Sequence, residues 1–442
     1  MIQSLADALF LPYAIIALLG TGLFLTIRLR FVQFRRLPEA LRSIALRSRG
    51  GGAGVLSPFQ AFATSLAASV GTGNIAGVAT AIISGGPGAL FWIWVYGLVA
   101  TSIKFAEAVL GVRFREVAGG EVRSGSMYFL RDGLRSPALA WFYAFVAGVA
   151  ALTTTPFTQP NSMAIALDSV FGVPPWLAGI VIAVLVAAVI LGGIAAIGRA
   201  AEKLAPLKVV LYLVGGIIVI VTFADRLPAV FRLILSEALT TRSIFGFGMF
   251  TAMRYGIARG AYANEAGYGT AAVAFGTAKS NNPTEQGLQA VVETFIISFV
   301  TTTISALTIL VTGVAEQSIA AARAGAEPLT STAAVASAFN AAMPAVGGWI
   351  VAVCACLFGY TTLVGWSYYG EQFLEYILGP RVRVPYRWMY CLLIPVGAVL
   401  RPDLVWAWGD LMNVFQIFPN VFGLIALSGI VAGYARGKAA AG

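Results

Sequence analysis

Long apolar segments, separated by short charged or Pro/Gly-rich stretches, recur along the whole 442-residue chain. Only 11% of the residues are charged and 59% are hydrophobic, whereas soluble proteins carry about 25% charged residues. A spanning helix needs about 20 apolar residues, so we predict an all-α polytopic membrane protein with about eleven transmembrane helices. The spans are expected near 8–27, 57–83, 88–112, 138–169, 176–198, 204–224, 244–272, 286–314, 346–378, 386–400 and 404–434.

The composition also argues against enzymatic chemistry. The chain has no histidine, which removes His-ligated metals and Ser-His-Asp triads. Its cysteines, Cys354, Cys356 and Cys391, lie in apolar runs without metal-site spacing. The spans show no nucleophile–base pair, so we expect no enzyme activity and no cofactor. The net charge of +10 is interpreted as a topology signal rather than as nucleic-acid binding.

The distribution of Lys and Arg predicts the orientation in the membrane. Of 29 such residues, 23 fall in segments that share one side if the eleven spans alternate. Because basic loops stay in the cytoplasm, we expect an outside N-terminus and a cytoplasmic C-terminus in an inner or plasma membrane. These basic segments are 28–49, 113–135, 199–208, 254–279, 381–387 and 436–438.

Helix-breaking glycines stand in the middle of two spans that lie five spans apart. Span two carries Gly71, Gly73 and Gly77, and span seven carries glycines at the positions 246, 248, 256 and 260. Paired interrupted helices are typical of secondary transporters built from inverted repeats. We therefore expect two five-helix repeats preceded by one extra helix. The expected divisions are 1–56 (extra helix and basic segment), 57–225 and 226–435 (the repeats) and 436–442 (a cytoplasmic tail).

A break in span two offers binding groups for a carboxylate and for a small cation. Amide N–H groups near Thr72–Asn74 can bind a carboxylate at a helix N-terminus, and carbonyls near Ala67–Val70 can coordinate a small cation. The same stretch fits the dinucleotide pattern G-x-G-x-x-A, but no βαβ context surrounds it. Close helix packing explains Gly71 and Gly77 but not a polar Thr-Gly-Asn.

Other polar side chains at depth allow two interpretations each. Gln159 and Asn161 in span four either line a pocket or bond between helices. Thr361 and Thr362 in span nine either complete an oxygen cage for a monovalent ion or bond back to their own helix.

Four charged side chains have predicted roles in gating or structure. Lys104 and Glu107, at i and i+3, are expected to form an ion pair. In the sequence Asn264-Glu265 at the cytoplasmic end of span seven, the carboxylate either braces an inner gate near Arg259 or pairs at the interface. A fifth, Glu293, is either a proton site or a paired carboxylate.

Several motifs together resemble the alanine/glycine:cation symporters, the sodium:alanine symporter family. They are SPFQAFATSLAASVGTGNIAGVATAI, QPNSMAIAL, RYGIARGAYANEAGYGTA and YTTLVGWSYYGE, in order from about Ser57 to the last span. The resemblance implies a LeuT-type fold with five-plus-five inverted repeats.

The resemblance also implies site residues. Thr72 and Gly73 would bind the substrate carboxylate through backbone N–H groups, with Asn74 nearby, and Gln159 would contact the amino end. The implied sodium ligands are Ala67, Val70, Thr361 and Thr362.

Two departures from the family pattern bear on the site, and a third, at residues 124–129, bears on an inner loop. Phe245, Gly246 and Phe247 stand where the family has a run of small residues beside the pocket. Ile297-Ser298 replaces an Asp-Thr pair, which removes one carboxylate.

The resulting hypothesis is sodium-coupled symport of a small neutral L- or D-amino acid by alternating access, with sodium as the co-transported ion. The lipid bilayer is its expected environment, and neither nucleic acid nor an obligate protein partner is expected. Proton coupling through Glu293 or Glu265 is the alternative within transport. A transporter-like amino-acid sensor is the alternative from another class.

Overall fold

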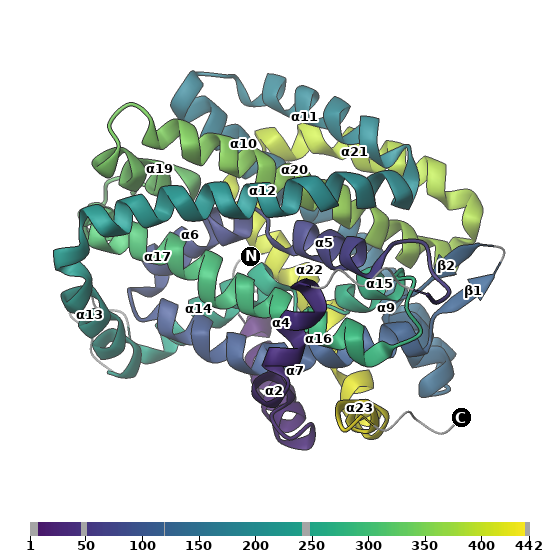
Figure 1. The fold of residues 1–442 in the computed structure, drawn as a ribbon. Coiled ribbons are helices and arrows are strands. Elements are labelled where there is room, and N and C mark those ends of the chain that lie inside the picture. Colours follow the sequence, from purple (N-terminus) through teal and green to yellow (C-terminus); the bar gives the residue numbers. More distant parts are fainter. Residues whose placement is uncertain (1–7, 46–50, 119, 241–247, 438–442) are drawn as a thin grey trace.

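The computed structural model describes residues 8–45, 51–118, 120–240 and 248–437, which are almost entirely helical (Figure 1). The first half contains η1 (Phe10–Ala14), α2 (Ile15–Arg28), α3 (Val32–Arg35), α4 (Leu37–Ala45), α5 (Pro58–Ser69), η2 (Thr72–Asn74), α6 (Ala76–Gly85), α7 (Ala89–Arg113), α8 (Ser126–Tyr128), η3 (Phe129–Gly133), α9 (Pro137–Thr153), α10 (Thr155–Phe171), α11 (Pro175–Ile190) and α12 (Gly193–Thr222). The second half contains η4 (Ala224–Arg226), α13 (Leu227–Leu239), α14 (Met249–Asn264), α15 (Thr270–Gly276), α16 (Pro283–Phe295), η5 (Ile296–Thr301), α17 (Thr302–Val311), α18 (Val314–Arg323), α19 (Ser331–Ala342), α20 (Gly347–Leu378), η6 (Pro380–Val382), α21 (Arg383–Val399), α22 (Pro402–Ala426) and α23 (Ser428–Ala435). One antiparallel hairpin pairs β1 (Glu116–Ala118) with β2 (Glu121–Arg123).

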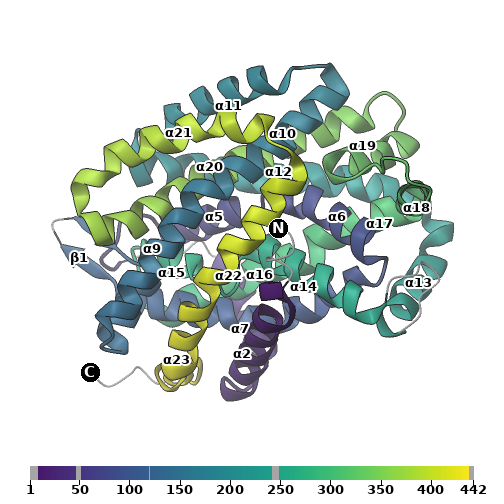
Figure 2. The same cartoon turned by 180° about the vertical axis from the view of Figure 1, so that it is seen from behind.

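The helices form two groups with a broken helix between them. Helices α10, α11, α12, α20 and α21 pack together on one side, and α7, α14 and α16 pack on the other (Figures 1 and 2). Helix α5 lies between them, in contact with α12 and α20 on one side and with α15 and α16 on the other. The break that follows α5 is therefore enclosed by protein rather than exposed to lipid.

Within the described residues, five helices are long and apolar enough to cross a membrane, or up to seven if each of two bent pairs is one span. The multi-pass membrane character expected from the sequence is therefore confirmed, while the number of eleven spans stays a prediction. One bent pair, α5 with η2–α6, turns by 60°, as the glycines of span two predict. The other pair, α22 with α23, turns by 63° and was not predicted.

The predicted break in span seven lies at the wrong residues. Helix α14 runs through Gly256 and Gly260 without interruption, and both glycines let it approach α7 closely. The chain leaves the helix at Glu265 and resumes at Thr270. The break has positive φ angles at Glu265 (58°), Gly267 (94°) and Gly269 (84°). The two glycines adopt that backbone region without strain.

The connection predicted between spans five and six, at residues 199–203, also lies at the wrong residues. Helix α11 ends at Ile190, and α12 begins at Gly193, whose φ is +67°. The turn at this glycine therefore precedes the basic residues, which all lie within α12. Arg199 and Lys203 are exposed there, whereas Lys208 is fully buried.

The new position of the span-seven break bears on the predicted orientation. Arg254 and Arg259 lie in α14, on the other side of the break from Lys279. Two residues of the basic segment 254–279 therefore leave the side on which they were counted. The basic residues still favour the same side, and the orientation stays a prediction.

Candidate functional site

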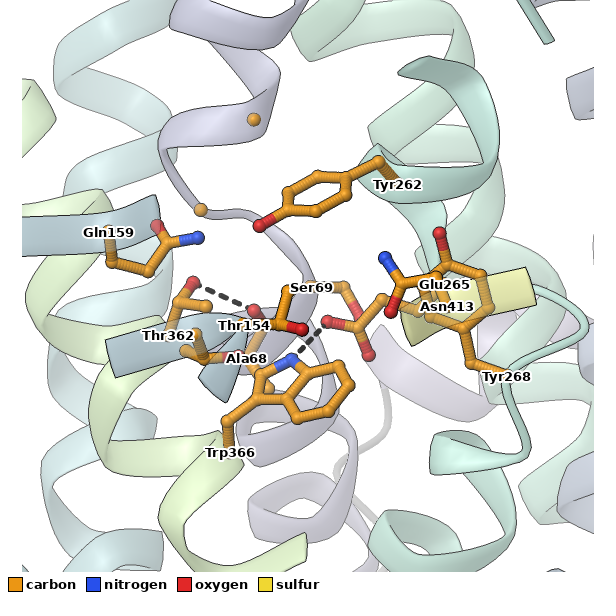
Figure 3. A pocket seen from close by; sticks show the side chains of 13 residues that line it. Ala68, Ser69, Thr154, Gln159, Tyr262, Glu265, Tyr268, Thr362, Trp366 and Asn413 are labelled. Atoms are coloured by element: carbon orange, nitrogen blue, oxygen red, sulfur yellow. Dashed lines mark hydrogen bonds between the residues drawn. The ribbon is translucent and has the colours of Figure 1, made fainter. Parts of the chain in front are cut away.

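A small cavity lies where the two broken helices meet (Figure 3). The break after α5 contributes Gly71 and Gly73, and the break after α14 contributes Glu265 and Tyr268. The remaining lining residues come from α5, α10, α14, α20, α22 and the junction before α10: Ala68, Ser69, Thr154, Thr155, Gln159, Tyr262, Thr362, Trp366 and Asn413. Among all these lining residues, Glu265 is the only charged one.

Gln159 presents its amide nitrogen to the cavity. Its Oε1 accepts hydrogen bonds from the backbone N–H and the hydroxyl of Thr72, both at 2.9 Å. These two donors fix the orientation of the amide, since only the oxygen can accept them. The Nε2 group points into the cavity (Figure 3) and has a single long contact of 3.5 Å, to Thr158 Oγ1. Gln159 therefore offers N–H donors, which suit a carboxylate better than an ammonium group.

The backbone of the first break adds a further donor. The N–H of Thr72 is taken by Gln159, whereas the N–H of Gly73 has no hydrogen-bond partner within the described residues. Both groups stand at the start of the half-helix η2–α6, where the helix dipole favours a negative charge. Gly73 therefore remains available to a carboxylate, and Thr72 acts by orienting Gln159.

Glu265 forms the acceptor end of the cavity. Trp366 Nε1 donates to its Oε1 at 2.6 Å (Figure 3), and Thr270 Oγ1 donates to its Oε2 at 2.8 Å. A carboxylate accepts about four hydrogen bonds, so two lone pairs remain for a ligand. Its left-handed backbone conformation is uncommon for a residue other than glycine, and such outliers are concentrated at functional sites.

Arg259, which the prediction places near Glu265, pairs with another carboxylate. Arg259 forms a buried ion pair with Asp410 of α22. Its guanidinium also lies over the rings of Trp406, at 4.9 Å, and Tyr262, at 5.9 Å. Trp406, Arg259 and Asp410 line a second cavity, while Tyr262 lines the first. This cluster therefore separates the two cavities.

Three asparagines with predicted roles contact protein rather than the cavity. Asn74 accepts a hydrogen bond from Thr301 at 3.0 Å and donates to the carbonyl of Ser69 at 3.1 Å. Asn264 donates to Ser298 at 3.1 Å. Asn161 donates to the carbonyl of Leu400 at 2.7 Å, outside the cavity lining. The first two hold the broken segments in place, and the third joins α10 to the end of α21.

The predicted Lys104–Glu107 ion pair is wrong as well. Lys104 pairs with Glu293 at 2.9 Å, and both side chains are fully buried. Glu107 instead accepts hydrogen bonds from the N–H groups of Gly267 and Gly269, at 2.9 and 3.0 Å. It thereby ties α7 to the second break. Of the two interpretations of Glu293, the paired carboxylate agrees with these contacts.

The four predicted sodium ligands do come together, around a side chain that the prediction did not include. Lys208 Nζ donates to the carbonyls of Ala67 and Val70 at 2.9 and 2.6 Å, and to Thr361 Oγ1 at 2.5 Å. Thr362 donates to the carbonyl of Ala68 at 2.7 Å. The prediction counts Lys208 in the cytoplasmic basic segment 199–208, because a basic residue beside an apolar segment usually marks a membrane boundary.

Two further predicted site residues, Phe245 and Gly246, lie outside the described residues, as does Phe247. The structure therefore bears on neither the predicted contact with substrate nor the effect of these phenylalanines on the pocket.

Gly71 is expected to tolerate no side chain. A Cβ atom there would lie 2.6 Å from Thr362 Oγ1 and 2.8 Å from Gln159 Oε1, which is too close for either atom. The substitution Gly71→Ala should therefore displace Gln159 and lower substrate affinity at least about tenfold, the loss of one charge-assisted hydrogen bond. The measurement is equilibrium binding of labelled alanine to the purified protein.

Gly77→Ala is the matched control for this substitution. Its Cβ would meet only ordinary contacts, at 3.5 Å to Trp406 and 3.6 Å to Arg259. Its affinity should stay near that of the wild type. Equal affinities of the two variants would contradict the assignment of Gly71 to the ligand cavity.

Two broken helices around a polar, protein-enclosed cavity define a secondary transporter. The comparisons with known proteins agree with this class. Residues 1–437 match the sodium:alanine symporter family, and the chain belongs to that family. It is 40% identical to the sodium/alanine symporter AgcS of Methanococcus maripaludis, over 95% of this chain and 92% of that protein.

Another relative and a solved structure extend the comparison. The chain is 30% identical to the probable sodium/glutamine symporter GlnT of Bacillus subtilis, over 96% of this chain and 87% of that protein. The crystal structure of MhsT in complex with L-phenylalanine superposes with a TM-score of 0.58 at 12% identity, covering 86% of this chain and all of that one. The expected LeuT-type fold is thus confirmed. The chain is an amino-acid:cation symporter by family, not an enzyme.

Proposed function

We propose that this chain transports a small neutral α-amino acid, bound as a zwitterion in the cavity between the two helix breaks. The observation that carries the proposal is the opposed chemistry of the two ends of the cavity. Gln159 Nε2 and the N–H of Gly73 supply donors at one end, and the carboxylate of Glu265 supplies acceptors at the other.

The lining supports a neutral side chain on the substrate. Glu265 is the only charged residue among the lining residues, and the amino group of the substrate would neutralise it. The carboxylate of the substrate would accept from Gln159 and Gly73, so a further charge on its side chain would be buried without a partner, which is strongly unfavourable. The aromatic side chains of Tyr262, Tyr268 and Trp366 limit the remaining space, which favours a small substrate such as alanine.

This arrangement changes the role assigned to Gln159. The resemblance implied contact with the amino end, but the amide oxygen of Gln159 is already bonded to Thr72. We therefore assign Gln159 to the carboxylate end and Glu265 to the amino end.

The family name makes sodium the first candidate for the co-transported ion. The ammonium group of Lys208 contacts three of the predicted sodium ligands, which argues against sodium at that position.

For the membrane orientation, we retain an outside N-terminus and a cytoplasmic C-terminus. We also retain the two repeats, 57–225 and 226–435, and expect the interrupted helices to rock against the other spans in alternating access.

The proposal is tested with ligands that lack one of the two charges. Alanine should bind to the purified protein, whereas propionate, which lacks the amino group, and isopropylamine, which lacks the carboxylate, should each bind at least about tenfold more weakly. Each missing charged group removes hydrogen bonds worth about 1.5–3 kcal/mol. If either analogue competed with labelled alanine as well as alanine itself does, the two-ended cavity would be wrong.

A further inference from the structure

The ammonium group of Lys208 occupies the centre of an oxygen cage. Helix α12 carries this lysine past the C-terminal end of α5, and its side chain is fully buried. Its Nζ contacts the carbonyls of Ala67 and Val70 and the hydroxyl of Thr361. An ammonium group has three N–H donors, so three oxygens satisfy it completely.

The groups in direct contact with the ammonium group are dipoles rather than carboxylates. Ala67 lies in the last turn of α5 and Val70 at its C-cap, where the helix dipole favours positive charge. The ring of Phe358 lies 5.2 Å from Nζ and adds a cation–π contact. Among the described residues, no carboxylate forms a hydrogen bond with Lys208 Nζ.

The same oxygens would suit a bound monovalent metal ion, but the two cations exclude each other. Carbonyl and hydroxyl oxygens are ligands for hard cations. A sodium ion bound to Ala67, Val70 and Thr361 would stand against the ammonium group at contact distance, in a buried site. The electrostatic repulsion between two positive charges at this distance in a buried site is strongly unfavourable.

We propose that Lys208 is the built-in cation of this site, in place of sodium. It holds the end of α5 and α20 together through Ala67, Val70 and Thr361, and so organises the break that binds the amino acid. Sodium therefore does not bind at this cage and is not required there for substrate binding. The claim that substrate binding does not require sodium rests on the proposed function. The claim that sodium does not bind at this cage does not.

The first test measures sodium binding without any substrate. A ligand that binds only the folded protein raises its melting temperature. We expect the melting temperature of the wild-type protein in detergent to be the same in sodium chloride and in N-methyl-D-glucamine chloride of equal ionic strength. Lys208→Met empties the cage, and sodium should then raise its melting temperature by about 3 °C.

Lys203→Met is the matched control, because Lys203 lies on the same helix but is exposed. It should behave as the wild type does. The wild-type comparison needs no variant, so it tests sodium binding at the cage even if Lys208→Met does not fold. Stabilisation of the wild type by sodium as large as that expected for Lys208→Met would overturn the proposal, and so would a folded Lys208→Met that ignores sodium.

The second test adds the substrate and separates the two proposals. Labelled alanine should bind the wild type equally well, within about twofold, with and without sodium. Binding that falls tenfold or more without sodium would overturn the role of Lys208 while leaving the proposed function intact. Failure of every small neutral amino acid to bind in either medium would overturn the proposed function, and the melting temperatures would still decide the cation site.

Discussion

Replacing Glu265 by glutamine is expected to lower the affinity for alanine by about 10- to 100-fold. In the proposed binding mode its carboxylate accepts the ammonium group of the substrate, and a hydrogen bond between charged groups contributes about 1.5–3 kcal/mol. Glutamine keeps the shape and can retain contacts to Trp366 and Thr270, whose groups lie 2.6 and 2.8 Å from the carboxylate. The fold should therefore survive while the charge is lost.

The measurement is equilibrium binding of labelled alanine, with the melting temperature recorded for each variant. Glu316→Gln, a change of the same type at an exposed position on α18, should leave the affinity near that of the wild type. An affinity of Glu265→Gln within twofold of the wild type would remove Glu265 from the substrate contacts.

The largest effect on stability is expected for Lys104→Met. Lys104 and Glu293 pair at 2.9 Å with both side chains fully buried. Removing one partner of a buried pair leaves an uncompensated charge, which costs about 3–5 kcal/mol. Ser65 and Ser69 would still donate to Glu293, at 2.8 and 2.9 Å, but hydroxyl donors do not replace a full positive charge.

The double variant Lys104→Met/Glu293→Gln should recover much of this loss, because glutamine is neutral and can still bond to the two serines. Thermal unfolding of the wild type, both single variants and the double variant in detergent forms the required cycle. A double variant less stable than Lys104→Met would show that the charge of Glu293 is not what destabilises the single variant.

The sequence predicted the first helix break because its signal is local. Gly71-Thr72-Gly73-Asn74 combines helix-breaking residues with polar groups inside an apolar segment, and the break lies there. In span seven the break predicted from the glycines was wrong, because Gly256 and Gly260 allow α14 to pack closely against α7. The informative signal was the later sequence Asn264-Glu265-Ala266-Gly267-Tyr268-Gly269, where two glycines adopt positive φ.

The partners of the buried charges could not be predicted from spacing. Lys104 and Glu107 satisfy the i, i+3 rule, yet the partner of Lys104 is Glu293, 189 positions further along the chain. Lys208 meets oxygens of residues that lie 138 to 153 positions away. Such contacts depend on how the helices pack. What the sequence does contain is a lysine directly before the apolar stretch of α12, and a buried lysine there requires partners.

The most direct test of the account is uptake of labelled alanine into proteoliposomes that contain the purified chain, with unlabelled alanine inside and sodium-free medium on both sides. The account predicts rapid exchange uptake by the wild type. Glu265 and Gln159 bind the substrate at the two ends of the cavity, and Lys208 takes the place of sodium in the cation cage. It predicts strongly reduced uptake at the same alanine concentration by Glu265→Gln. Wild-type uptake no greater than that of protein-free liposomes, for alanine and for every other small neutral amino acid, would contradict it.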